Sequence, residues 1–335
     1  MSRKSEQETG STKNSDRQNF VRRFLFGDAA VERGDGCLRT DLLMDARTEG
    51  WIGIPHGGIG MGAIMELATM LDSYPRNAER RYPMSLEFRM GGPSVRIGDR
   101  LSVEVAEREK GAEGEIFATR DDFPYIAASI KYGDPGPHGE DPLPACIPGS
   151  FSDIEDRLTP LPYYINCFVC GVGRTHPGLA RRFYFLDGGA LKGTVVSLAG
   201  FDLADSRSIS RFQKDGCIHP IATLALMDET LGWGGFMIAA SGAVTVRISY
   251  TLHRDIMAGE RFVVCGRGDR VRGKGARMMF WASGALASVR SDGSLETAIT
   301  ASGQWLGVPE LTRQMREELI PKELTEQAFL AAGAH

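Results

Sequence analysis

Two long apolar segments stand out in the pattern of hydrophobic and polar positions along the chain. Residues 54–72 (IPHGGIGMGAIMELATMLD) and 218–235 (IHPIATLALMDETLGWGG) both carry a His close to their start, followed by Gly or Pro. Apolar side chains recur on every face of a helix drawn through these residues, which is typical of a fully buried helix. Each segment is therefore predicted to form a long central helix that begins near its His.

Short strands are predicted after each helix. Leu101, Val103 and Val105 alternate with more polar residues, which is the period-2 pattern of a half-buried strand. Turn residues such as Gly98 and Gly111 separate neighbouring apolar runs. Along the whole chain this reading predicts strands near residues 84–90, 101–108, 115–120 and 125–132, and again near residues 243–253, 261–267, 276–289 and 296–306.

The second half of the chain repeats the order of elements of the first half. His56 and His219 lie 163 positions apart, and Gly98 and Gly259, each just before a strand, lie 161 positions apart. Nearly equal offsets indicate an internal duplication; two unrelated α+β domains are the alternative. We therefore expect an α+β protein with repeats at residues 19–134 and 163–308, a disordered tail at 1–18, a Pro-rich linker at 135–162 and a closing helix or tail at 309–335.

Composition narrows the classes of function. The chain has 335 residues, 42% of them hydrophobic and 24% charged, as in ordinary globular proteins. Its net charge of −4 argues against nucleic-acid binding. No apolar run approaches the length of about 20 residues that a membrane span needs, and the polar N-terminus lacks the features of a secretory signal. Six scattered cysteines fit a reducing compartment, so we expect a cytoplasmic protein.

The second half resembles the hotdog-fold acyl-CoA thioesterases of the PaaI-like branch, in which an antiparallel sheet wraps a long helix. The likeness covers nearly all of residues 163–307, and the first half matches more thinly, through IPHGG and the strands that follow. The whole chain thus looks like a tandem double-hotdog protein. The motifs that carry the likeness are NCFVCG at 166–171, HPGL at 176–179, FQKDGCIHP at 212–220, LALMDETLGW at 224–233 and AVTVRISYTLHRDIMAGE at 243–260.

The resemblance implies two catalytic parts per site. In such enzymes the backbone N–H just after the His polarises the thioester carbonyl, and a carboxylate nine residues after the His activates water or attacks directly. Nine residues span about 13 Å along a helix, so the donor and the acid must come from two antiparallel helices. The first repeat keeps the donor, Gly57, but has Met65 at the acid position. The second repeat has Asp228 at the acid position but Pro220, which lacks an N–H, at the donor position.

The two repeats together therefore predict one complete site, made of the Gly57 N–H and Asp228. His56 is expected to orient the start of the helix through hydrogen bonds, and Glu229 and Glu66 are further candidate acids because a carboxylate in an apolar helix is costly unless paired or used. The family's amide side chain upstream of the His has a candidate in Gln213, whereas Gly50 stands at that place in the first repeat. Two more residues are expected to contact the substrate, namely Gly58 and Trp233.

We interpret the sequence as a thioesterase that hydrolyses an acyl-CoA or related acyl thioester, without a metal or another cofactor. The double hotdog resembles a fused dimer and is a candidate for further pairing into a homodimer. Two alternatives stay open: an acyl-thioester binding protein without turnover, and a hydratase or dehydratase, for which no His–acid pair is visible in the sequence.

Two further motifs suggest other ligands. The run from Gly58 to Ala63 fits the G-x-G-x-x-A dinucleotide pattern, but no β-branched strand precedes it. Cys167 and Cys170, with His176 or with Cys217 and His219, could make a zinc site, although the regular second half of such a motif is missing. The simpler reading makes both cysteines small buried residues at the start of a strand.

Overall fold

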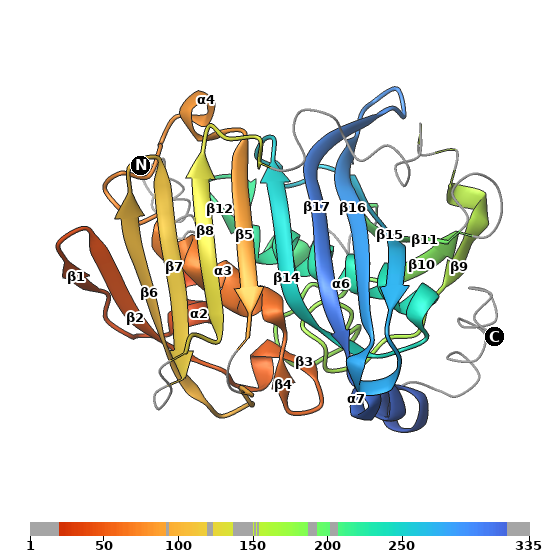
Figure 1. Ribbon diagram of the computed structural model, residues 1–335. Coiled ribbons are helices and arrows are strands. Elements are labelled where there is room, and N and C mark those ends of the chain that lie inside the picture. The colour runs from red at the N-terminus through yellow and green to blue at the C-terminus, as the bar shows by residue number, and fades with distance from the viewer. Residues whose placement is uncertain are drawn as a thin grey trace, which may run out of the picture.

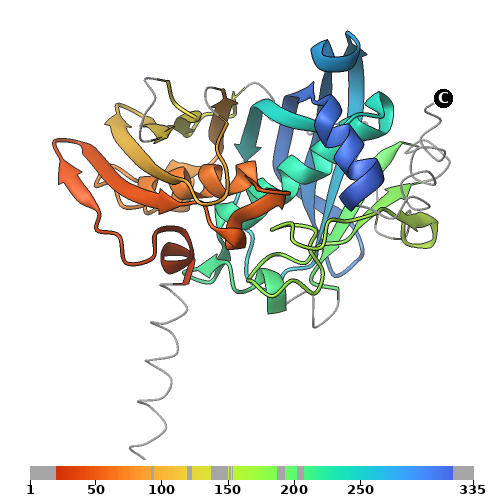
Figure 2. The same cartoon turned by 90° about the horizontal axis from the view of Figure 1, so that it is seen from below.

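The computed structural model describes residues 20–91, 94–118, 123–136, 150, 152, 154–186, 193–201 and 207–319. The predicted tail at residues 1–18, most of the predicted linker and the end of the chain lie outside these residues. Within the described chain, thirteen strands form one continuous sheet, and the two long helices pack on one face of it (Figures 1 and 2).

Each half of the sheet has the same internal strand order. In the first half the order is β1-β2-β6-β7-β8-β5, and in the second half it is β14-β17-β16-β15-β11-β10-β9, so β5 and β14 meet in the middle. The first half consists of β1 (Glu32–Gly34), β2 (Cys37–Leu43), β5 (Met84–Met90), β6 (Arg100–Arg108), β7 (Gly111–Ala118) and β8 (Ile126–Tyr132). The second half consists of β9 (Leu158–Pro160), β10 (Phe183–Leu186), β11 (Thr194–Ala199), β14 (Ala243–Leu252), β15 (Phe262–Arg272), β16 (Met279–Val289) and β17 (Leu295–Gly307).

The strand order confirms the predicted duplication. Starting at β5 and at β14 and moving outward, each half presents its last long strand, then its third, then its second, and then a strand that precedes its helix. β5 and β14 pair antiparallel, with Arg89 opposite Arg247 and Met84 opposite Leu252. The chain is therefore an α+β protein of two tandem hotdog repeats that share one sheet.

The two central helices are α3 (Gly57–Ala68) and α6 (Pro220–Ala239). They pack against each other, and 11 of the 12 residues of α3 and 15 of the 20 residues of α6 are buried, which agrees with the apolar pattern of both segments. The first helix ends four residues before the predicted end, because residues 69–74 form turns. The second helix runs to Ala239, four residues beyond its predicted end, and is capped by Ala240 in the left-handed conformation.

Glycines allow the close crossing of the two helices. A Cβ placed on Gly58 would lie 2.3 Å from the Cβ of Ala225, and one on Gly62 would lie 2.5 Å from the Cβ of Ile221. A Cβ on Gly60 would lie 2.4 Å from Ile126 Cδ1 in the sheet. The glycines that fit a dinucleotide pattern are therefore filled by protein contacts on both sides, which leaves no room for a pyrophosphate.

The shorter elements complete the fold. Two small hairpins, β3 (Glu49–Trp51) with β4 (Ile54–Pro55) and β12 (Gln213–Lys214) with β13 (Cys217–Ile218), lead into the two central helices. None of the helices in the described part of the chain is both long and apolar enough to cross a membrane. The remaining helical segments are α2 (Phe20–Phe26), α4 (Ala78–Arg81), α7 (Pro309–Gln314), η1 (Ala46–Thr48), η4 (Glu155–Arg157), η5 (Gly275–Arg277) and the π-turn η6 (Met315–Leu319).

Candidate active site

A histidine caps the start of each central helix. The Nδ1 atom of His56 accepts the Gly58 N–H at 3.0 Å, and Nδ1 of His219 accepts the Ile221 N–H at 3.1 Å. Both residues have extended backbone dihedrals, as N-cap residues do. Because Nδ1 accepts a hydrogen bond, each neutral ring carries its proton on Nε2. The two rings therefore point a donor toward the neighbouring helix.

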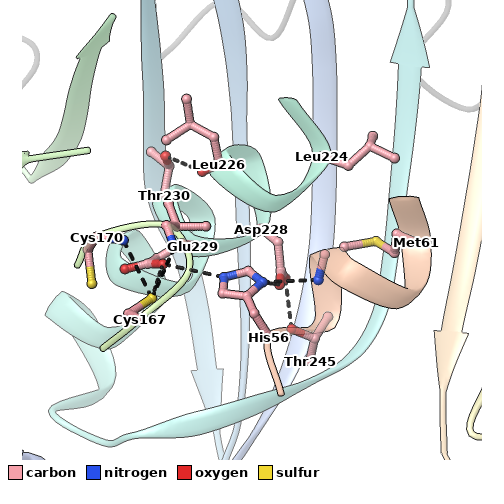
Figure 3. A network of polar contacts seen from close by, with 12 residues as sticks. His56, Met61, Cys167, Cys170, Leu224, Leu226, Asp228, Glu229, Thr230 and Thr245 are labelled. Atoms are coloured by element: carbon pink, nitrogen blue, oxygen red, sulfur yellow. Dashed lines mark hydrogen bonds and ion pairs between the residues drawn. The ribbon is translucent and has the colours of Figure 1, made fainter. Parts of the chain in front are cut away.

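The acids of α6 reach the start of α3 (Figure 3). His56 Nε2 lies 3.3 Å from Glu229 Oε2, and His56 Nδ1 lies 4.0 Å from Asp228 Oδ2. A Cβ placed on Gly57 would lie 3.5 Å from Asp228 Oδ2. The structure therefore brings together four of the predicted site residues, from two repeats, at one place.

Thr245, the third residue of β14, holds Asp228 in place. Its hydroxyl donates to Asp228 Oδ1 at 2.8 Å, leaving Oδ2 directed toward His56 and Gly57. Burial raises the pKa of Asp228, and the charge of His56 and the Thr245 hydrogen bond only partly oppose this rise. Thr245 was not predicted, because the alternation of β14 indicates a strand but gives no distance to α6.

Cys167 is a second partner of Glu229 that sequence reasoning missed. Its thiol donates to Glu229 Oε2 at 3.2 Å, and its sulfur accepts the N–H groups of Val169 and Cys170 at 3.3 and 3.4 Å. Cys167 lies in a turn-rich loop, so the expected position at a strand start is wrong. Burial raises the pKa of its thiol. The C-x-x-C motif, together with an acid in a helix predicted to be buried, is the sequence feature that could have indicated this contact.

His56 is held between these acids. Burial alone would lower its pKa, but the hydrogen bond to Glu229 and the charges of Asp228 and Glu229 raise it above the ordinary value. The protonated ring is therefore favoured more than in a free histidine. A ring protonated at Nδ1 could not accept the Gly58 N–H, so the helix cap that the structure shows is made by the neutral ring.

A cavity of about 330 Å³ opens beside these residues, within the usual size range of small-molecule sites. Its polar end holds the histidine, the two acids, Gly57 and Thr245. Gly232, one helical turn after Asp228, leaves a gap next to Trp305. The apolar end is lined by Trp233, Phe236, Phe280, Trp305 and Met315. The cavity therefore runs from a charged cluster to an aromatic pocket, and Trp233, which is expected to contact the substrate, lines this cavity.

The two central helices meet at two places where the start of one lies beside an acid of the other. We call the place at the start of α3, beside the cavity, the open crossing. The place at the start of α6 does not border the cavity, and we call it the closed crossing. Glu66 accepts hydrogen bonds from His219 at 3.1 Å and from Lys214 at 2.8 and 2.9 Å. Glu66 is the counterpart of Glu229, ten residues after the capping His, and Met65 stands where the other repeat has Asp228. Glu66 does not line the cavity. The structure thus separates it from the other candidate acids.

Both members of this closed pair have a lowered pKa. Burial alone would raise the pKa of Glu66, but the His219 hydrogen bond and the Lys214 charge lower it below the ordinary value. The pKa of His219 is lowered because burial outweighs the attraction of Glu66. Together these directions describe an ionised carboxylate that accepts from a neutral imidazole and a charged lysine.

Gln213, Gly58 and Gly50 bear on the predicted substrate contacts. Gln213 lies in β12 beside the closed crossing and does not line the cavity. Gly58 is packed against Ala225, and its N–H is used by His56, so it is not free to contact a substrate. At Gly50 a Cβ would lie 2.8 Å from the Cα of His56. No side chain fits at position 50, so the amide side chain that the resemblance implies upstream of the His cannot be present at the open crossing.

Three side chains of the site could together bind a metal ion such as zinc. The ligand atoms of His56, Cys167 and Glu229 lie within 4.8 Å of one another. However, a zinc ligand at Nε2 needs a lone pair there, whereas the Gly58 hydrogen bond places the proton on Nε2. Zinc also binds thiolate, and burial raises the pKa of the Cys167 thiol. The cluster therefore fits a hydrogen-bonded network better than a metal centre.

Comparisons with known proteins identify the fold. No protein-family model matches the sequence, and no curated protein matches it. Among solved structures, the tesB protein of Mycobacterium avium subspecies paratuberculosis is 11% identical, with a TM-score of 0.51 over 88% of this chain and 100% of that one. A thioesterase II from Thermobifida fusca is 16% identical, with a TM-score of 0.51 over 83% of this chain and 96% of that one.

A third structure, GphF Dehydratase 1, is 13% identical, with a TM-score of 0.50 over 85% of this chain and 98% of its own. Identities this low show a common fold only. They agree with the double-hotdog architecture derived above, and they include proteins named for two different reactions.

Proposed function

We propose that this chain hydrolyses an acyl thioester, such as an acyl-CoA, at a single composite site between its two repeats. The observation that carries the proposal is the meeting of Gly57 and Asp228 at the polar end of a cavity. The names of the tesB protein and of the thioesterase II structure support an acyl thioester as the substrate class.

Each residue of the site then has a chemical role. The N–H of Gly57 belongs to the first turn of α3, where helix N–H groups have no intrahelical acceptor, so it is suited to bind the thioester oxygen as charge develops. Asp228 takes a proton from water while the water oxygen bonds to the carbonyl carbon. The C–S bond then breaks, and the leaving thiolate takes the proton from Asp228, which leaves a carboxylic acid and a thiol.

Asp228 is suited to this role because it is buried, and burial raises its pKa toward neutrality. A base whose pKa lies nearer to the operating pH transfers protons more effectively. Direct attack by the carboxylate on the carbonyl carbon is the alternative use of the same group. His56 accepts the Gly58 N–H and thereby fixes the helix start that presents Gly57.

The closed crossing supplies the control for a test. Thiol release from a panel of acyl-CoA thioesters should be lost in Asp228→Asn, by roughly 10³-fold or more in kcat. Met65→Leu changes the equivalent position of the other repeat, and it should leave kcat near the wild-type value because it conserves the buried volume. Equal losses in both variants would contradict a single site. Tight binding of acyl-CoA without any thiol release would instead identify a binding protein.

A dehydratase is the second candidate, favoured by the His56–Asp228 contact at 4.0 Å. A histidine and a carboxylate across a substrate can move the proton and the hydroxyl of a β-hydroxyacyl thioester. The neighbour named GphF Dehydratase 1 adds support for this reaction class. A β-hydroxyacyl thioester distinguishes the two proposals, because dehydration produces ultraviolet-absorbing enoyl product without free thiol, whereas hydrolysis releases thiol.

A further inference from the structure

Tyr125 lines the cavity but takes no part in the steps proposed for hydrolysis or dehydration. It directly precedes β8, and its backbone is fixed on both sides: its N–H donates to Ile116 O at 2.7 Å, and its carbonyl accepts the Gly91 N–H at 3.2 Å. Among the described residues, its hydroxyl has no hydrogen-bond partner. A positioned phenol that opens into a cavity is available to a ligand.

Met90 lies close to Gly57, whose N–H is proposed to bind the carbonyl oxygen, and it belongs to the strand that pairs with the strand after Tyr125. Met90 is paired with Ile126, the residue after Tyr125. A Cβ placed on Gly57 would lie 3.1 Å from Met90 Cε. Tyr125, Met90 and Gly57 all line the cavity that Asp228 also lines.

The phenol stays protonated over the whole working pH range. Burial, together with the nearby charge of Asp228, raises the pKa of Tyr125 to about 12. A phenol with this pKa is a hydrogen-bond donor at neutral pH and a weak proton donor toward a thiolate, whose pKa is about 8.5. It is therefore suited to stabilise a developing negative charge rather than to protonate the leaving group.

We propose that the Tyr125 hydroxyl donates a second hydrogen bond to the thioester carbonyl oxygen, beside the N–H of Gly57. This inference rests on the proposed hydrolysis and deepens it. One backbone N–H supplies one donor, whereas the oxyanion of a tetrahedral intermediate is commonly held by more than one, and tyrosine is among the side chains that serve. Since the oxygen carries full negative charge only after attack, the bond strengthens toward the transition state.

The first test is steady-state kinetics of Tyr125→Phe with the best acyl-CoA of the panel. We expect kcat to fall by roughly 10²-fold, as for the loss of one oxyanion donor, with KM nearly unchanged. Tyr132→Phe is the matched control, because it removes the buried, unpartnered hydroxyl of a tyrosine on β8 that packs against Tyr74 instead of lining the cavity. A Tyr125→Phe enzyme with wild-type kcat would overturn the inference.

A second measurement does not depend on turnover. A ketone analogue of the acyl-CoA, with CH2 in place of sulfur and ¹³C at the carbonyl, should show a lower carbonyl stretching frequency when bound to the wild-type protein. Tyr125→Phe should reverse part of that shift, whereas Tyr132→Phe should not. An identical frequency in wild type and Tyr125→Phe would refute the hydrogen bond, even if the protein hydrolyses no thioester. Absence of thiol release from every wild-type assay would instead contradict the proposed function.

Discussion

At the scale of single residues, the open and the closed crossing differ at a few matched positions. Each repeat has a capping histidine and an acid ten residues later, and each crossing joins the histidine of one repeat to that acid of the other. The open crossing has an N–H donor and a second acid, whereas the closed crossing has neither and contains a lysine that donates hydrogen bonds to Glu66. The matched pairs are Gly57 with Pro220, Asp228 with Met65, and Trp51 with Lys214.

The pH dependence of the reaction is determined at this scale. If Asp228 must be ionised, kcat/KM should rise with pH through an apparent pKa above 3.8, the direction in which burial moves this group. Thr245→Val removes a hydrogen bond that lowers this pKa, so the acidic limb should move to higher pH. Rate profiles between pH 4 and 8 measure the limb. A limb that does not move would mean that another group controls it.

At the scale of elements, glycines decide how the two helices meet. Gly58→Ala should destabilise the protein by about 1–3 kcal/mol, because its Cβ would overlap Ala225 and push α6 away from α3. Gly232→Ala is the matched control in a helix. There the new Cβ would lie 3.6 Å from Trp305 Nε1, in ordinary contact, and stability should rise by up to about 1 kcal/mol. Urea unfolding compares the two, and equal effects would contradict the tight crossing.

The same helix sets the length of the acyl pocket. Gly232 is the only side-chain-free position of α6 among the residues that line the cavity, and it lies between Asp228 and the aromatic end. Gly232→Leu should fill that passage. We expect kcat/KM for long or aromatic acyl-CoA thioesters to fall by more than tenfold, while acetyl-CoA or another short substrate is less affected. Equal losses for all chain lengths would place the acyl group elsewhere.

At the scale of the whole molecule, the closed crossing ties the two repeats together. Glu66 comes from the first repeat, and Lys214 and His219 come from the second. The folded pKa of Glu66 is lowered, so its stabilisation is present above its unfolded value of 4.5 and is lost as pH falls. The pKa of His219 is also lowered, so protonation below its unfolded value of 6.5 favours unfolding as well. Both shifts make stability fall on acidification.

Removing the lysine tests this link. Lys214→Met should lower the free energy of unfolding at pH 7 by about 3 kcal/mol, because Glu66 remains buried with its charge only partly compensated. Adding Glu66→Gln should recover part of the loss, since a neutral amide needs no cation. Thermal unfolding of the single and double variants between pH 4 and 7 measures this. If the double variant is no more stable than Lys214→Met, the loss of stability does not come from the uncompensated charge of Glu66.

Assembly into larger units stays a prediction. β1 and β9 form the two edges of the described sheet, and each is only three residues long. Short edge strands protect a sheet against edge-to-edge pairing. A homodimer would therefore have to use another surface, and sedimentation measures whether one forms. The cytoplasmic location also stays a prediction.

The sequence by itself determined the elements and their duplication. Alternation in residues 101–105 and the apolar runs after His56 and His219 predict strands and helices, because these patterns depend only on the local repeat of each structure. The equal spacing of the two halves, together with the family motifs, also predicted that Gly57 and Asp228 share a site. These inferences need no knowledge of how the strands are registered.

The tertiary structure decided which side chains complete the site. Thr245, Cys167 and Tyr125 reach it from a strand, a loop and the start of another strand, and no sequence spacing links them to Asp228. The structure also moved Glu66 to the closed crossing, where Lys214 neutralises it. Such contacts depend on strand register and on the crossing of α3 and α6, which are fixed by packing between distant residues, so only the folded chain reveals them.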